Sequence, residues 1–126
     1  MNELENLVVN GTDMDQKLVA EVLAPYVRLD KDNCNIRPTD GWYPLSSEIK
    51  ILVYLLARRA MVALKFDINY EGATASEIVR DTGLKSGTAH PTLRKLLDRR
   101  LVEQSKDRRY SIPNHAISRI RSMIPE

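Results

Sequence analysis

Apolar residues recur at helical spacing in a short stretch near the start of the sequence. Residues 18–23 place their apolar side chains on one stripe, as an amphipathic helix does. Thr12 or Asp13 can cap this helix, and Pro25 ends it because proline lacks the N–H of the helical hydrogen bond. The stripe consists of Leu18, Val19, Val22 and Leu23.

The pattern then changes to short runs that favour extended chain. Residues 26–29 and 34–37 are both rich in such positions, and they flank Asp30-Lys31-Asp32-Asn33, whose side chains are typical of turns. We predict a β-hairpin here. The Asp-x-Asp spacing is only a faint match to a calcium loop, because the sharp-turn glycine and the closing glutamate are missing.

A long helix is predicted over Glu48–Phe66, with Ser46 or Ser47 as its cap. Its polar residues form one narrow stripe, whereas a surface helix is usually apolar over only about a third of its circumference. We therefore expect this helix to be buried on two sides, by its own domain and by either the N-terminal extension or a second copy of the chain. The polar stripe consists of Lys50, Tyr54, Arg58 and Lys65, with Arg59 beside it.

Two shorter helices follow. Thr74-Ala75-Ser76-Glu77 is a capping box, and Gly83 can take the left-handed conformation that stops a helix. After a tight turn at 84–86, a second helix begins near Ser86 to Thr88 and runs to about Arg99, with Pro91 expected in its first turn. Its inner face consists of Ala89, Leu93, Leu96 and Leu97.

The last third of the sequence predicts a β-hairpin and a final helix. Residues 101–105 and 110–112 read as strands around the charged turn 106–109, and Asn114 can cap a helix that has Ile117, Ile120 and Ile124 along one side. The expected fold is therefore mainly α with a small β-hairpin wing (α+β), as in a winged helix-turn-helix. We place an N-terminal helix and hairpin extension at 1–45 and the winged-helix domain at 46–126.

Charge is distributed unevenly although the net charge is only +2. Residues 1–57 hold 5 Lys or Arg and 9 Asp or Glu, whereas residues 58–126 hold 14 and 8. The basic half contains the two short helices and the wing. Such asymmetry favours a polyanion as the partner of that half.

The second half resembles the winged helix-turn-helix of archaeal and bacterial regulators of the MarR, ArsR and PadR groups. The run Ser86-Gly87-Thr88-Ala89-His90-Pro91-Thr92-Leu93-Arg94-Lys95-Leu96, followed by Arg100-Leu101-Val102, is most similar to PadR-type recognition helices. The resemblance covers about Glu48 to Ile124. The chain departs from it at Arg100, where glycine is frequent, and at His90, where an aromatic residue is frequent.

This resemblance implies that the second short helix enters a DNA major groove, where the first turns of a helix reach base edges. Gly87 would allow close backbone approach, the short polar side chains would read bases or phosphates, and the cations would contact phosphates. The N-terminus of the helix capped by Thr74 offers amides to a further phosphate. The predicted DNA-binding residues are Thr74, Ser76, Lys85, Ser86, Gly87, Thr88, His90, Thr92, Arg94, Lys95 and Arg99 in the helices, and Lys106, Arg108 and Arg109 in the wing.

The sequence gives little support for a secreted protein, a membrane protein, a metalloprotein or an enzyme. Cys34 is the only cysteine, so no intrachain disulfide or cysteine-based zinc site can form, which fits a reducing compartment. Residues 1–10 lack the basic start of a signal peptide, and four charges interrupt the apolar stretch 49–66, so we expect a cytoplasmic protein without a membrane span. The two histidines, His90 and His115, are too far apart to share a metal on one helix, and no phosphate-binding loop or nucleophile elbow occurs. We therefore predict no enzyme activity, no cofactor and no metal.

The most favoured function is sequence-specific binding of double-stranded DNA by a homodimer that regulates transcription. Two recognition helices would occupy an inverted repeat in successive major grooves, about 34 Å apart. The predicted dimer interface consists of Leu18, Val22, Ile49, Leu52, Leu56, Ile117, Ile120 and Ile124.

Two alternatives remain open. A plasmid or chromosome partition adaptor would use the same DNA-binding residues and dock a partner protein on the acidic N-terminal extension. A winged helix can also serve as a protein–protein interaction module, but the recognition helix of such a module is often acidic or apolar, and here it is basic.

Overall fold

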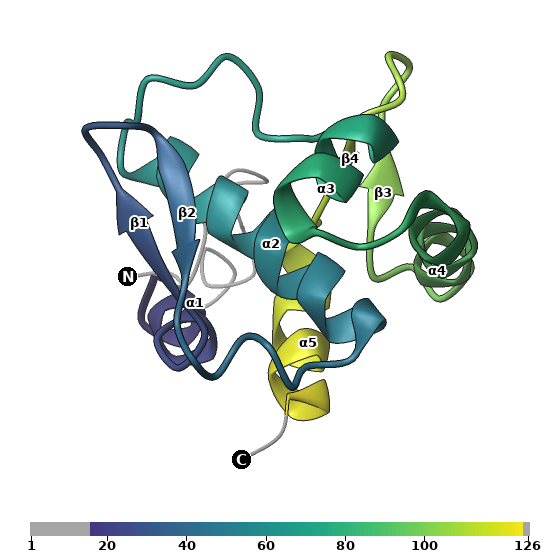
Figure 1. Cartoon of the computed structure of the whole chain (residues 1–126), viewed down its shortest axis with the longest axis horizontal. Helices are drawn as coiled ribbons and strands as arrows, with labels where there is room; N and C mark the ends of the chain where they lie inside the picture. Colours follow the sequence, from purple (N-terminus) through teal and green to yellow (C-terminus); the bar gives the residue numbers. More distant parts are fainter. Residues whose placement is uncertain (1–15, 125–126) are drawn as a thin grey trace, which may run out of the picture.

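A single long helix, α2 (Ser47–Ala63), lies at the centre of the computed structural model, which describes residues 16–124 (Figure 1). About half of the described residues are helical, and the strands form two separate antiparallel hairpins. The α+β class is thus confirmed, and the arrangement is compatible with a winged helix. None of the helices within residues 16–124 combines the length and the apolarity that crossing a bilayer requires.

Helix α2 is buried on nearly every side, as its sequence predicts. The hydroxyl of Ser46 accepts a hydrogen bond from the Ile49 amide and starts the helix. The helix ends at Ala63, three residues before the predicted Phe66. Lys65 takes the left-handed conformation, and the Phe66 amide donates back to the Met61 carbonyl, which is a Schellman ending without glycine.

The described part of the N-terminal extension, residues 16–45, covers one side of α2 (Figure 1). Helix α1 (Gln16–Leu23) ends before Pro25, and the predicted hairpin is present as β1 (Val27–Asp30) paired with β2 (Asn35–Pro38). The Asp30 carboxylate closes the turn by accepting hydrogen bonds from Asn33 and Arg37. The predicted cap residues Thr12 and Asp13 lie outside the described residues.

Helices α3 (Ala75–Thr82) and α4 (Ser86–Asp98) pack against the other side of α2. Helix α3 has the predicted capping box, and Gly83 ends it with φ of 77°. The position predicted for Pro91 is wrong: it lies in the second turn of α4, because the helix already begins at Ser86. Having no N–H, Pro91 leaves the Gly87 carbonyl without its usual helical donor.

The wing is smaller than predicted. Its strands are only β3 (Glu103–Gln104) and β4 (Tyr110–Ser111), but Ala73, just before α3, exchanges two backbone hydrogen bonds with Tyr110 on the outer edge of β4. This bridge ties the wing to the start of α3. Sequence periodicity alone could not find it, because Ala73 belongs to no strand-like run.

The final segment consists of a 3₁₀ turn, η2 (Asn114–Ala116), and helix α5 (Ile117–Met123). The expected capping role of Asn114 is wrong. Its side-chain oxygen instead accepts a hydrogen bond from Arg59, whose guanidinium also donates to the Ile112 carbonyl. Arg59, which the sequence places beside the polar stripe of α2, is buried and holds the end of the wing onto that helix.

One continuous core contains residues of both the extension and the second half, from Val19 in α1 to Ile120 in α5. This core corrects the predicted dimer interface. Both sides of α2 are covered within one chain, so most of the side chains assigned to the interface cannot face a partner. Buried in the single chain are Val22, Ile49, Leu52, Leu56, Ile117 and Ile120, while Leu18 and Ile124 are partly buried against the same core.

Candidate nucleic-acid interface

Helix α4 and the wing lie together at one end of the molecule, opposite α1 and the β1–β2 hairpin (Figure 1). The inner face of α4 is held in the core by Ala89, Leu93 and Leu96. Its outer face carries the polar residues that the sequence predicts. Exposed there are Lys85, Ser86, Gly87, Thr88, His90, Arg94, Lys95 and Arg99, whereas Thr92 is half-buried and its hydroxyl donates to the Thr88 carbonyl.

The first turns of α4 are open to a partner. Lys85 precedes the helix without a capping hydrogen bond from its side chain, so the first amides are not covered by a cap. A Cβ built at Gly87 would meet no atom within 4 Å. Packing within the chain therefore does not require glycine at this position. His90 is exposed as well and does not pack beneath the wing.

The cations of α4 fall into two groups. Lys95 and Arg99, at the C-terminal end of the helix, both pair with the Glu48 carboxylate at the start of α2, and Lys95 Nζ lies 3.5 Å from it. Lys85 and Arg94 form no ion pair within residues 16–124. The positive charge of α4 that is available to an external anion therefore lies at Lys85 and Arg94.

The three predicted wing residues also differ from one another. Arg109 is anchored inside the protein: its guanidinium lies 2.8 Å from the Glu77 carboxylate and 3.9 Å from the centre of the Tyr70 ring. Its side chain is only 20% exposed, so it supports the wing instead of pointing from the tip. Lys106 and Arg108 are exposed at the tip and have no ion pair in the described structure.

The N-terminus of α3 is already occupied by its own capping box. The Thr74 hydroxyl accepts from the Glu77 amide, and the Glu77 carboxylate accepts from the Thr74 amide. Burial raises the pKa of the Glu77 carboxyl, but the Thr74 hydrogen bond and the charge of Arg109 outweigh it and hold that pKa below its ordinary value. Thr74 is therefore a structural residue, and of the two residues predicted here only Ser76 is exposed.

Together these positions form a surface that we call the basic face: the outer side of α4 from Lys85 to Arg94 and the wing tip. Its cations, none of them in an ion pair with any residue of 16–124, are Lys85, Arg94, Lys106 and Arg108. Ser86, Thr88 and His90 add hydrogen-bonding groups. Such a surface can neutralise phosphates and present short polar side chains to base edges. Asp107 is the acidic side chain of the wing tip, and it lies 3.3 Å from Arg109.

Two structural partners of this surface could not be found from the sequence. Glu48 is far from Lys95 and Arg99 along the chain, and Tyr70 lies in a connector without periodicity. Of the partners that hold these cations, the sequence pointed only to Glu77, as a member of the capping box. Its pairing with Arg109 depends on how the wing folds back onto α3.

A comparison of the chain with protein-family models finds no match, and comparisons with curated proteins and with solved structures find none either.

Proposed function

We propose that this protein is a winged-helix, sequence-specific binder of double-stranded DNA that regulates transcription. The observation that carries the proposal is the basic face: within residues 16–124, its four cations have no ion pair, and they lie on the open side of α4 and the adjacent wing tip. A solvated helix surface of ordinary composition would mix charges of both signs. On α4 the acidic residue is Asp98, in the last turn, and the Glu48 carboxylate of α2 faces the same C-terminal end, so the first turns are left with cations and neutral polar groups.

The shape of the helix supports the same proposal. An α-helix fits the major groove and its N-terminal residues reach base edges. In α4 those residues include Gly87, which leaves room for close approach, and Thr88 and His90, which carry hydrogen-bonding groups. The wing tip would then contact the backbone beside the groove, since Arg109 and the Ala73 bridge fix its position relative to α3.

Two copies of the chain cannot associate through the predicted interface residues, because most of these residues lie in the core of one chain. We propose that the free protein is a monomer and that two copies assemble on an inverted repeat. The DNA would then set the distance between the two recognition helices.

The test is fluorescence anisotropy with a duplex from the gene's own upstream region and a scrambled duplex of equal composition. With four phosphate contacts, affinity should fall about a hundredfold between about 50 and 200 mM salt. The upstream duplex should bind more tightly than the scrambled one. The variant Lys85→Gln/Arg94→Gln should lose binding to both. Each single variant, Lys85→Gln and Arg94→Gln, should weaken binding, whereas Arg121→Gln on α5 is the matched control for loss of one exposed cation and should not.

A second variant is expected to raise the DNA affinity instead of lowering it. Glu48→Gln removes one negative charge and releases Lys95 and Arg99. It should raise DNA affinity and steepen the salt dependence, because two more cations become available. Absence of binding to either duplex at low salt would contradict the proposal and favour a protein-docking module.

A further inference from the structure

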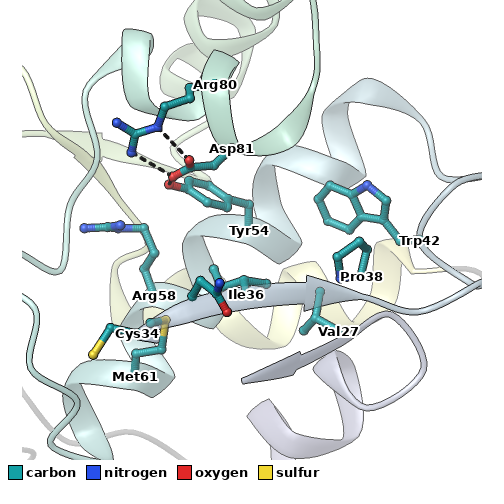
Figure 2. Close-up of a pocket in the computed structure, with 11 residues that line it drawn as sticks. Val27, Cys34, Ile36, Pro38, Trp42, Tyr54, Arg58, Met61, Arg80 and Asp81 are labelled. Atoms are coloured by element: carbon teal, nitrogen blue, oxygen red, sulfur yellow. Dashed lines mark hydrogen bonds and ion pairs between the residues drawn. The ribbon is translucent and has the colours of Figure 1, made fainter. Parts of the chain in front are cut away.

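A cavity of about 280 Å³ lies between the β1–β2 hairpin and helices α2 and α3, and none of the cations of the basic face lines it (Figure 2). The apolar part of its lining includes Val27, Ile36, Trp42 and Met61. More than half of the lining comes from residues 27–42, which are outside the resemblance to winged-helix regulators. The cavity is thus a feature of how this extension packs on the second half of the chain.

The lining of the cavity also carries positive charge. Arg58 donates from Nε to the Glu71 carbonyl at 2.9 Å and from Nη2 to the Tyr70 carbonyl at 2.6 Å. Within residues 16–124 it forms no direct ion pair, although its charge helps to lower the pKa of the nearby Asp81 carboxyl. Arg80 lies above Arg58, 2.8 Å from the Asp81 carboxylate (Figure 2). Among the residues that line the cavity, two guanidinium groups and one carboxylate leave an excess of one positive charge.

Tyr54 adds a neutral polar group at the centre. Its hydroxyl donates to the Asp81 carboxylate, and burial, together with that hydrogen bond, raises the pKa of the phenol well above its usual range. The Tyr54 side chain therefore stays uncharged at physiological pH. It does not reduce the excess positive charge contributed by Arg58 and Arg80.

We propose that this cavity binds a small organic monocarboxylate, with its apolar body against Trp42 and Ile36 and its carboxylate toward Arg58 and Arg80. The volume is at the lower end for ligand sites, which limits the ligand to about one ring or a short chain. Guanidinium groups are well suited to carboxylates because their parallel N–H groups match the two oxygens. A dianion would exceed the available positive charge, and a neutral analogue would leave it uncompensated.

The cavity lies where a bound ligand could affect DNA binding. This coupling rests on the DNA-binding function proposed above. Arg80 and Asp81 belong to the last turn of α3, directly before the Gly83 turn that leads into α4. A carboxylate that draws Arg80 away from Asp81 would change the surroundings of the Asp81 carboxylate, which accepts a hydrogen bond from Tyr54 and so links the end of α3 to α2. Ligand binding should therefore alter the DNA affinity of the basic face.

Intrinsic fluorescence provides a direct test, because Trp42 is the only tryptophan of the chain and lines the cavity. The full-length protein is titrated with benzoate and hexanoate, and in parallel with benzamide and hexanamide as uncharged analogues. A saturable change in Trp42 emission is expected with at least one carboxylate and not with its amide. No response to either carboxylate up to about 10 mM, or an equal response to acid and amide, would overturn the proposal.

Arg80→Gln is the decisive variant, because the Arg80 side chain is 69% exposed and its loss should leave the fold intact. It should weaken carboxylate binding at least tenfold, while Arg121→Gln should bind as the wild type does. Unchanged thermal unfolding of Arg80→Gln confirms that the fold is retained, and unchanged affinity in this variant would refute the assignment.

The effect on DNA is measured separately, by anisotropy with and without saturating carboxylate. A severalfold change in the wild type that is absent in Arg80→Gln would support the coupling. Carboxylate binding by a protein that binds no DNA would leave the site established and refute the proposed function. DNA binding without any response to carboxylates would support the proposed function and refute the carboxylate site.

Discussion

At the scale of single residues, backbone conformation gives two glycines opposite roles. A Cβ added at Gly83 or at Gly87 would meet open space, but Gly83 has φ of 77° and Gly87 lies in the first turn of a regular helix. We predict that Gly83→Ala destabilises the protein by about 1 kcal/mol, since an L-residue is strained in the left-handed region. Gly87→Ala should stabilise it by about 0.5–1 kcal/mol.

Thermal unfolding of the two variants measures this difference, and anisotropy then separates stability from binding. If DNA approaches the α4 backbone closely, Gly87→Ala weakens binding although it stabilises the fold. A Gly87→Ala variant that binds DNA as tightly as the wild type would contradict close approach. Arg100 provides a similar case: it has φ of 59° at the end of α4, a conformation that strains an L-residue but not glycine, so Arg100→Gly should be stabilising.

Glu77 is predicted to make stability depend on pH. Its folded-state pKa lies below the ordinary value of 4.5, so its stabilising effect is complete above that pH and is lost as the pH falls through the folded-state pKa. Glu77→Gln keeps a capping hydrogen bond but loses the charge beside Arg109. It should be less stable than the wild type at neutral pH by about 1 kcal/mol or less, as is usual for a partly exposed pair.

The difference between wild type and Glu77→Gln should shrink as the pH is lowered below 4.5, when the wild-type carboxyl becomes neutral. Thermal unfolding over a pH series provides the measurement. Glu103→Gln, which removes an exposed carboxylate of β3, is the control and should show no such convergence. A difference that stays constant with pH would show that Glu77 acts only through its hydrogen bond.

At the scale of elements, two neighbouring arginines have different roles in the wing. Arg109 holds the wing through Glu77, the Gly72 carbonyl and the Tyr70 ring, whereas Arg108 is exposed at the tip. Arg109→Ala should cost about 1–3 kcal/mol, because a charge-assisted hydrogen bond and a ring contact are lost together. Arg108→Ala should change stability by less than about 0.5 kcal/mol.

The DNA affinities should follow a different order from the stabilities. Arg108→Ala is expected to weaken binding in a protein of normal stability, and to reduce the salt dependence by about one phosphate contact. If Arg109→Ala instead kept full stability and lost DNA binding, Arg109 would contact DNA directly, as the sequence alone suggests.

At the scale of the whole molecule, the burial of α2 determines the expected oligomeric state. Helix α1 and the β1–β2 hairpin cover one side of α2, and α3 and α4 cover the other. Because the apolar surface that argued for a dimer is used within one chain, we predict that the free protein sediments as a 14.4 kDa monomer at micromolar concentration. On an inverted-repeat duplex, two copies should bind per duplex.

A stable dimer in the absence of DNA would contradict this prediction and would require a surface outside the core residues. In that case, variants at Val62 and Leu64 are the first to examine, because both are exposed apolar residues at the end of α2. Mass photometry or sedimentation with the duplex would distinguish one copy from two.

Much of the local structure could be predicted from the sequence, because its causes are local. The capping box at Thr74 and Glu77, the stop at Gly83 and the Asp-Asn turn of the first hairpin depend on residues only a few positions apart. Boundaries were less accurate where a non-glycine residue took the left-handed conformation, as Lys65 does. A lysine side chain has no property from which the left-handed conformation could be predicted.

The order and type of the elements and the basic character of α4 thus follow from the sequence alone, since periodicity and turn chemistry act within a few residues. Which charges are already paired depends on the folded chain. Glu48 neutralises Lys95 and Arg99, and Glu77 anchors Arg109, across distances along the chain that no local pattern spans. The same packing placed Arg58 and Arg80 around one cavity and filled both sides of α2, because these contacts exist only once the chain has folded back on itself.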